Sequence, residues 1–152
     1  MDDDIRAFGM EVGGKAIAQD WLGVHSMLAP WLRPVMAVDD VKAFFEDEYR
    51  ATLEASDVEG MHYPEYPEAS VDGNGFTKAT QLREPISFAG GKVRAVPPEV
   101  TDENVRYWLE LVLQCSDAQM EKWNFDQFCE VWMAVVDTPE GLRIGYWSQG
   151  AY

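Results

Sequence analysis

The sequence contains few of the residues that build disulfide or metal-held frameworks. Its only two cysteines, Cys115 and Cys129, are too few for a disulfide framework and lack the spacing of metal ligands. Both lie in apolar segments, where a free cysteine behaves as a small hydrophobic residue. The motifs HExxH, CxxC and GxSxG are absent as well. Nothing in the sequence therefore indicates a bound metal, a cofactor or an activated nucleophile.

Two glycine-containing stretches lack the parts that would make them ligand loops. Residues 9–14 follow no predicted strand and do not end in Gly-Lys-Ser or Gly-Lys-Thr, so they do not form a phosphate loop. Asp72-Gly73-Asn74-Gly75 has neither the third acidic position nor the terminal glutamate of a calcium loop. A tight turn is the expected structure there.

Basic residues are scarce. The chain has 27 acidic side chains against 12 lysines and arginines, which gives a formal net charge of −15. Residues 1–60 hold 13 acidic and 5 basic side chains, and residues 61–152 hold 14 and 7, so the charge is spread evenly. Such a surface repels nucleic acid and anionic lipid, so neither is an expected partner. It is either a solvated acidic surface, which we favour, or a mimic of nucleic acid of the kind that some inhibitor and immunity proteins use.

Long apolar runs and a basic N-terminus are also missing. No run approaches the roughly 20 apolar residues that span a membrane. The start, Met1-Asp2-Asp3-Asp4, is acidic where a signal peptide would be basic. We therefore predict a cytoplasmic protein without a membrane partner.

Apolar and aromatic side chains, in contrast, are abundant. Of the 152 residues, 47% are hydrophobic, and six are tryptophan. A chain of this length forms one ordinary domain, which buries about 70% of the surface that its unfolded chain exposes. We predict a single domain, residues 1–152, with a core that needs no crosslinks.

The first third of the chain predicts helices. Asp4 is placed to cap a first helix that runs towards Leu28, with Gly23 and Pro30 dividing its second half. Its apolar stripe consists of Ile17, Trp21, Val24 and Leu28. Gly9, Gly13 and Gly14 weaken its front half, each by about 1 kcal/mol relative to alanine.

A second helix is expected to start at Asp39, with Val38 as a hydrophobic staple before it. Its apolar face is made of Val41, Phe44, Phe45, Tyr49 and Leu53. Residues 57–100 are rich in proline and glycine, which predicts turns and short strands, including a tight hairpin turn within 88–93.

The stretch 105–115 fits two structures. As a helix it would be capped by Thr101, and as a strand it alternates over eleven residues, which favours the strand. One face of that strand would hold Val105, Tyr107, Leu109, Leu111, Leu113 and Cys115, and the other Arg106, Trp108, Glu110, Val112 and Gln114. Ser116 and Gln119 then form a capping box for a short helix to about Trp123.

The C-terminal part predicts a β-hairpin from Phe128 to Ser148, turned at Thr138-Pro139-Glu140-Gly141. Both of its faces are apolar: Trp132, Ala134, Val136, Ile144 and Tyr146 on one, Val131, Met133, Val135 and Trp147 on the other. An antiparallel sheet normally leaves one face to water. Two apolar faces require two covers, helices on one and a second subunit or a pocket on the other.

Helices followed by a sheet that ends in the run Leu142-Arg143-Ile144-Gly145-Tyr146-Trp147 resemble the NTF2-like (cystatin-like α+β) superfamily. Ala16–Trp21 and His25–Pro30 also look like that family's opening helix and helical corner. The resemblance spans most of the chain, although residues 57–100 do not align with it. It implies an α+β fold in which N-terminal helices pack on a curved antiparallel sheet as a cone around an apolar pocket, and often a homodimer through the sheet. It implies no reaction, because members of one fold differ in function.

Candidate chemical groups are few. His25 and His62 either contribute to a site or fill ordinary structural positions, and the structural interpretation is favoured for both. Glu110, flanked by Trp108 and Val112 in the strand interpretation, is either a general base with a raised pKa or a solvent-exposed carboxylate, which is favoured. Glu130 has the same two interpretations with less support.

The sequence leads to two functional hypotheses. The first is an NTF2-like domain that binds a small apolar molecule in a pocket between helices and sheet, with a homodimer through the sheet. The pocket-lining residues predicted for it are His25, Trp108, Glu110, Trp132 and Tyr146, with Glu110 as the one catalytic candidate. The second is an acidic protein-interaction module of inhibitor or immunity type that acts through its surface. Whether the protein is an enzyme stays open.

Overall fold

A computed structural model describes residues 1–55, 68–73, 96–114, 121 and 128–149 of the chain. At 47–55, 68, 72–73, 114, 128–130 and 149 it describes the backbone only. The predicted turn within 88–93, the position of His62 and all but Glu121 of the predicted helix from Ser116 to Trp123 lie outside these residues.

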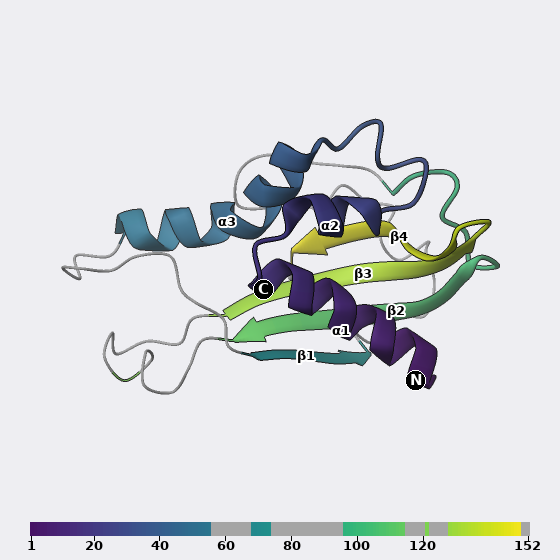
Figure 1. Ribbon diagram of the computed structural model, residues 1–152, viewed down its shortest axis with the longest axis horizontal. Helices are drawn as coiled ribbons and strands as arrows, with labels where there is room; N and C mark the ends of the chain where they lie inside the picture. The colour runs from purple at the N-terminus through teal and green to yellow at the C-terminus, as the bar shows by residue number, and fades with distance from the viewer. Residues whose placement is uncertain (56–67, 74–95, 115–120, 122–127, 150–152) are drawn as a thin grey trace.

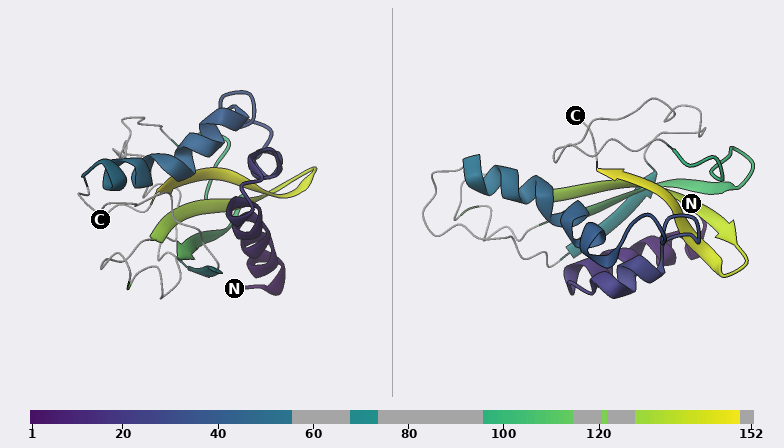
Figure 2. Two further views of the ribbon diagram at one scale, coloured as in Figure 1. Left: turned by 60° about the vertical axis from the view of Figure 1, so that its left-hand side comes forward. Right: turned by 90° about the horizontal axis from the view of Figure 1, so that it is seen from above.

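Three helices and a four-stranded antiparallel sheet make up the described part of the chain, which is an α+β fold (Figure 1). The helices are α1 Asp3–Ile17, α2 Trp21–Ser26 and α3 Val38–Ala55. The strands are β1 Glu68–Gly73, β2 Val105–Gln114, β3 Phe128–Thr138 and β4 Gly141–Gln149, hydrogen-bonded in the order β1-β2-β3-β4. The helix α1 lies along one face of the sheet, and residues 96–104 lie on the other side (Figure 2).

The first two helices depart from their predicted boundaries. Asp2, not Asp4, is the N-cap of α1, and its side chain makes no capping hydrogen bond. The predicted break at Gly23 is also wrong, because the chain turns at Gln19, whose φ of 56° no helix interior adopts. Asp20 then caps α2 by accepting a hydrogen bond from the backbone nitrogen of Gly23 at 2.9 Å. A strong N-cap residue in this position therefore decides where the second helix begins.

The helix predicted from Asp39 is confirmed as α3, which starts one residue earlier, at Val38. The Asp40 carboxylate accepts a hydrogen bond from the Ala37 backbone nitrogen at 2.9 Å, which fixes the helix start. Val41 and Phe45 are buried, and the Phe44 ring stacks on Trp147 with centroids 4.3 Å apart. Side chains in the first turns of α3 therefore pack against β4.

The strand favoured by the alternation is confirmed over Val105–Gln114, and Cys115 lies outside the described residues. β2 lies between β1 and β3, so it is hydrogen-bonded on both edges. Leu109, Leu111 and Leu113 belong to the core under the helices, while Trp108 belongs to a second cluster. The register is irregular between Val105 and Tyr107. Val105 therefore packs with Trp108 rather than with the leucines, which corrects its predicted face.

The terminal hairpin is confirmed. Thr138 pairs with Gly141 across the turn, and Gly141 has a φ of 103°, a conformation that glycine adopts without steric cost. The Thr138 hydroxyl donates to the Gly141 carbonyl at 2.9 Å and accepts from the Glu140 nitrogen at 3.1 Å. These bonds hold the turn that the sequence predicts.

One residue of the hairpin, Ile144, lies on the face opposite to the one predicted. The register shifts between Ala134 and Val135, so Ile144 pairs with Val135 and Tyr146 with Ala134. Ile144 consequently packs under the helices, and the extra residue is Gly145. The bulge lies where another segment of the chain hydrogen-bonds to the edge of β4 that no described strand pairs with. Met27 and Ala29 exchange backbone hydrogen bonds with Ile144, both of 2.8 Å.

The glycines of α1 allow the helix to lie directly on the sheet. A Cβ atom at Gly9 would lie 2.5 Å from Leu109 Cδ2, and one at Gly13 would lie 2.8 Å from Ala69 Cβ. Gly14, in contrast, has nothing within 4 Å of that position. The sequence indicates only a weakened helix, but two of these three glycines provide close packing between the helix and β1 or β2.

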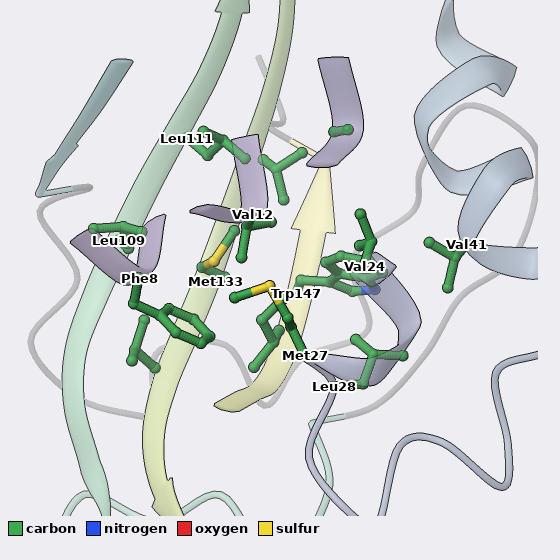
Figure 3. Packing of buried hydrophobic residues seen from close by; sticks show 14 of the residues in the cluster. Phe8, Val12, Val24, Met27, Leu28, Val41, Leu109, Leu111, Met133 and Trp147 are labelled. Atoms are coloured by element: carbon green, nitrogen blue, oxygen red, sulfur yellow. The ribbon is translucent and has the colours of Figure 1, made fainter. Parts of the chain in front are cut away.

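The main core lies between the helices and the sheet. Phe8 and Val12 of α1 point towards the sheet beside Leu109 and Met133 (Figure 3). Val12 and Met133 are completely buried. Apolar side chains therefore occupy the interface between α1 and the strands.

Candidate functional site

The sheet face turned away from α1, called here the outer face, carries the polar groups of interest. Trp108, Ala134 and Tyr146 are paired in register across β2, β3 and β4, and Glu110, Trp132 and Ser148 form the next row. Side chains of directly opposed residues share a face and lie next to one another. The second row therefore places a carboxylate, an indole and a hydroxyl side by side.

The row changes in exposure from one end to the other. Glu110 and Trp132 are half-buried, whereas Ser148 is only 1% exposed. The row is thus open to solvent at Glu110 and closed at Ser148.

Ser148 is the unusual member of this row. It is the one buried polar residue in the described part of the chain. Its hydroxyl has no hydrogen-bond partner among the residues that the structure describes. An unsatisfied buried hydroxyl costs about 1–3 kcal/mol, so most such groups in proteins have a partner. A polar atom placed against Ser148 would recover part of that cost.

The first row of the outer face is covered by the chain itself. Val100 is fully buried and packs with Trp108, Ala134 and Tyr146 in a cluster separate from the main core. This segment, residues 96–104, supplies part of the second cover that the sequence requires for the sheet.

Turn hydrogen bonds hold that segment in place. The Val100 nitrogen donates to the Pro97 carbonyl at 3.0 Å, and the Thr101 nitrogen donates to the Asn104 side-chain oxygen at 2.9 Å. The Asn104 amide also donates to the Glu99 carbonyl. Val100 is therefore held over the sheet by a defined turn.

Trp31 connects the helical corner to this region. Its indole nitrogen donates to the Gly145 carbonyl at 2.8 Å, at the bulge of β4. A Cβ atom on Gly145 would lie 2.8 Å from Val136 and 3.2 Å from Val100, so both valines pack against the bulge. The indole therefore satisfies a backbone group that the bulge leaves unpaired within the sheet.

The five predicted pocket residues fall on both sides of the sheet. Trp108, Glu110, Trp132 and Tyr146 share the outer face, as the alternation of β2 and of the hairpin predicts. His25 lies half-buried in α2, whose Val24 belongs to the core on the helical side. The four strand residues therefore form one set that does not include His25.

Sequence reasoning missed Ser148 and Val100. The alternation of β4 places Ser148 on the same face as Tyr146. Its burial and its lack of a hydrogen-bond partner among the described residues depend on the residues that surround it in the fold. Val100 follows two prolines in a segment that reads only as turns. Its role depends on which strand residues it reaches in the folded chain.

Two arginine–carboxylate contacts of the described residues lie near the turn end of the sheet. Arg33 donates to both carboxylate oxygens of Glu140, at 2.8 and 2.9 Å. Arg106 donates to both oxygens of Asp137, at 3.1 and 3.2 Å. The hydrogen bond and the negative charge of Asp137 raise the pKa of the Arg106 guanidinium. Both arginines are therefore committed to carboxylates of the protein.

Within the described residues, no group of three or more histidine, cysteine, aspartate or glutamate side chains is placed to hold a metal ion. The helices of that part of the chain are not long and apolar enough to cross a membrane. Comparison with protein-family models, curated proteins and solved structures found no match for this chain.

Proposed function

We propose that this protein is a small-molecule-binding domain of NTF2-like type, and that its ligand lies against the outer face of the sheet. The observation that carries the proposal is the buried Ser148 hydroxyl, which has no hydrogen-bond partner among the described residues and lies in one row with Trp132 and Glu110. Binding sites are mostly apolar and contain a few polar groups that orient the ligand. The two rows of the outer face together have that composition, with Glu110 and Ser148 as polar members among Trp108, Trp132, Ala134 and Tyr146.

The helical side offers less to a ligand. Among the described residues, the interface between α1 and the sheet is filled by apolar side chains, and Gly9 and Gly13 bring the helix too close for an intervening molecule. The sequence suggests a ligand pocket between the helices and the sheet. We propose instead that the ligand binds the opposite, outer face of the sheet.

The NTF2-like assignment rests on the arrangement of the elements. Three N-terminal helices precede an antiparallel sheet that ends in the predicted hairpin, and α1 packs on one sheet face. The cone and the homodimer of that superfamily are separate proposals, because a second subunit on the outer face would compete with the ligand for that surface. Light scattering tests the dimer: a concentration-independent monomer would count against it.

Nile red, a neutral fluorescent dye that brightens in apolar surroundings, tests the ligand site. We expect saturable binding to the wild type and at least tenfold weaker binding to Trp132→Ala. The control is Leu22→Ala, which removes a side chain 69% exposed on α2 and should bind as the wild type does. Equal binding by the two variants, or no saturable binding at all, would overturn the proposal.

The second hypothesis, an acidic protein-interaction module, is favoured by the net charge of −15. It predicts binding through surface carboxylates, which weakens steeply as salt rises. Trp132→Ala would then leave binding to a basic protein such as cytochrome c unchanged. The two hypotheses are therefore separated by the same variant.

A further inference from the structure

We infer that the ligand of the outer face is an organic ammonium ion, with its charged group at Glu110 and its apolar body over Trp132. This inference rests on the proposed function and names the ligand class. It follows from the order of three side chains across the sheet, Glu110 on β2, Trp132 on β3 and Ser148 on β4.

A carboxylate beside an indole favours a cation. The face of a tryptophan ring attracts ammonium groups within about 6 Å, and tryptophan does so better than other aromatic residues. Glu110 is paired in register with Trp132 and lies two residues along β2 from Trp108. A carboxylate accepts up to about four hydrogen bonds, so Glu110 can hold a ligand ammonium beside the interaction that it makes within the protein.

The direction of the ligand follows from the exposure of the row. Glu110 and Trp132 are half-buried, and Ser148 is 1% exposed. An ammonium group stays hydrated most easily at the open end, whereas an apolar body gains most at the closed end. The charged group therefore lies at Glu110, and the body extends over Trp132 towards Ser148.

Ser148 adds a preference for a ligand that carries a hydroxyl group. Neighbouring strands lie about 4.8 Å apart, so Glu110 and Ser148, two strands apart, are separated by about 10 Å along the row. A ring that bears a hydroxyl group opposite its ammonium chain spans nearly this length. Such a hydroxyl would give the Ser148 side chain a hydrogen-bond partner, which the described part of the chain does not provide.

The overall charge of the protein attracts the same class of ligand. A net charge of −15 raises the concentration of cations near the surface and lowers that of anions. This attraction is unspecific, so the experiment must separate it from the contact at Glu110. Salt does so, because at 0.5 M it screens charges beyond about 4–5 Å.

Calorimetric titration of the full chain in 0.5 M NaCl at pH 7 tests the inference with three probes of one shape. They are phenethylamine, a cation at this pH, 2-phenylethanol, which is neutral, and 3-phenylpropionate, an anion. We expect phenethylamine to bind at least tenfold more tightly than 2-phenylethanol, and 3-phenylpropionate to show no binding. In Glu110→Gln this preference should fall to less than threefold.

Glu11→Gln is the control for the loss of one charge. Glu11 is an exposed residue of α1 whose carboxylate lies 3.8 Å from Lys15, so its replacement changes the net charge equally at a distant position. It should keep the full preference for the amine. Circular dichroism in the near ultraviolet confirms that each variant retains its tertiary structure.

Tyramine, which adds a ring hydroxyl to phenethylamine, tests the Ser148 end. We expect tyramine to bind about threefold to tenfold more tightly than phenethylamine, an advantage that Ser148→Ala removes. Equal affinities for the amine and the alcohol, or an amine preference that survives Glu110→Gln, would overturn the inference. If the wild type then still binds Nile red and Trp132→Ala does not, only the ligand class is wrong. If Nile red also fails to bind, the proposed function fails with it.

Discussion

The two faces of the sheet are covered in different ways by one chain. On the helical side, Leu109, Met133 and Ile144 are completely buried under helices that the glycines of α1 bring close to the strands. On the outer face, Val100 covers Trp108 and Tyr146, whereas Glu110 and Trp132 stay half-buried. The Ser148 hydroxyl has no hydrogen-bond partner within residues 1–55, 68–73, 96–114, 121 and 128–149. One face is complete as an apolar core, and the other contains polar groups that a ligand can use.

This difference shows why two apolar faces do not imply two equal functions. Both faces of the hairpin look similar in the sequence, since large apolar residues occupy nearly every position. The structure separates them by the row of Glu110, Trp132 and Ser148, which lies on the outer face. The helical side should therefore determine stability, and the outer row should determine binding.

The largest effect on stability is expected on the helical side. Leu109→Ala should lower the free energy of unfolding by about 2–5 kcal/mol, because Leu109 is fully buried beneath α1. The matched pair is Val131→Ala, fully buried on that side, and Val112→Ala, half-buried on the outer face. Urea unfolding should show the larger loss for Val131→Ala, and equal losses would contradict the comparison.

The close approach of α1 predicts opposite results for neighbouring glycines. Gly13→Ala should destabilise the protein by about 1–2 kcal/mol, since overpacking against Ala69 outweighs a gain of about 1 kcal/mol in helix propensity. Gly14→Ala meets no atom within 4 Å and should stabilise it by up to about 1 kcal/mol. Thermal melting measures both, and a stabilising Gly13→Ala would mean that α1 lies farther from the sheet.

Trp31→Phe should have a moderate effect, because it removes the hydrogen bond to the Gly145 carbonyl and keeps most of the apolar contact. We expect a loss of about 0.5–1.5 kcal/mol in urea unfolding. Trp31→Leu also lacks the N–H donor, so comparing it with Trp31→Phe shows how much the shape of the side chain contributes. A loss below the error of the measurement in both variants would show that the bulge is satisfied in another way.

Ser148→Ala should have the smallest effect on stability, and of the opposite sign. Removing a buried hydroxyl that has no partner should leave the free energy of unfolding unchanged or raise it by up to about 1 kcal/mol. The same change should weaken tyramine binding. A clear destabilisation would show that the hydroxyl already has a partner in the folded protein.

Much of the fold follows from local signals in the sequence. Pro139 and Gly141 mark the hairpin turn, the alternation from 105 to 115 marks β2, and Val38 with Asp39 marks the start of α3 to within one residue. Each signal depends on residues close together in the chain. These elements were therefore predictable without knowledge of their neighbours.

The errors in strand face and in the role of Gly13 came from contacts between distant segments, whereas the helix boundaries at Asp2 and Gln19 depend on neighbouring residues. Ile144 changes face because of a bulge whose free backbone groups bind Met27, Ala29 and Trp31. Gly13 supports packing rather than weakening a helix because Ala69 of β1 lies opposite it. No local pattern contains either contact.

Only part of the candidate site was predictable, because the site also depends on contacts between distant segments. Alternation places Trp108 with Glu110 and Trp132 with Tyr146, but it does not say which residues of different strands are opposed. A shift of one residue in register would move a side chain to the other face. The row of Glu110, Trp132 and Ser148 could be recognised only once the strands were paired.

The central claim, that the outer row and not the helical side receives the ligand, is tested most directly by the indole N–H signals in an NMR titration with tyramine. The signals are assigned by replacing each tryptophan with phenylalanine in turn. We predict that the Trp132 signal moves most, and that those of Trp21 and Trp147, which lie with the main core, stay in place. A titration that moves Trp21 and Trp147 and leaves Trp132 unchanged would contradict the account.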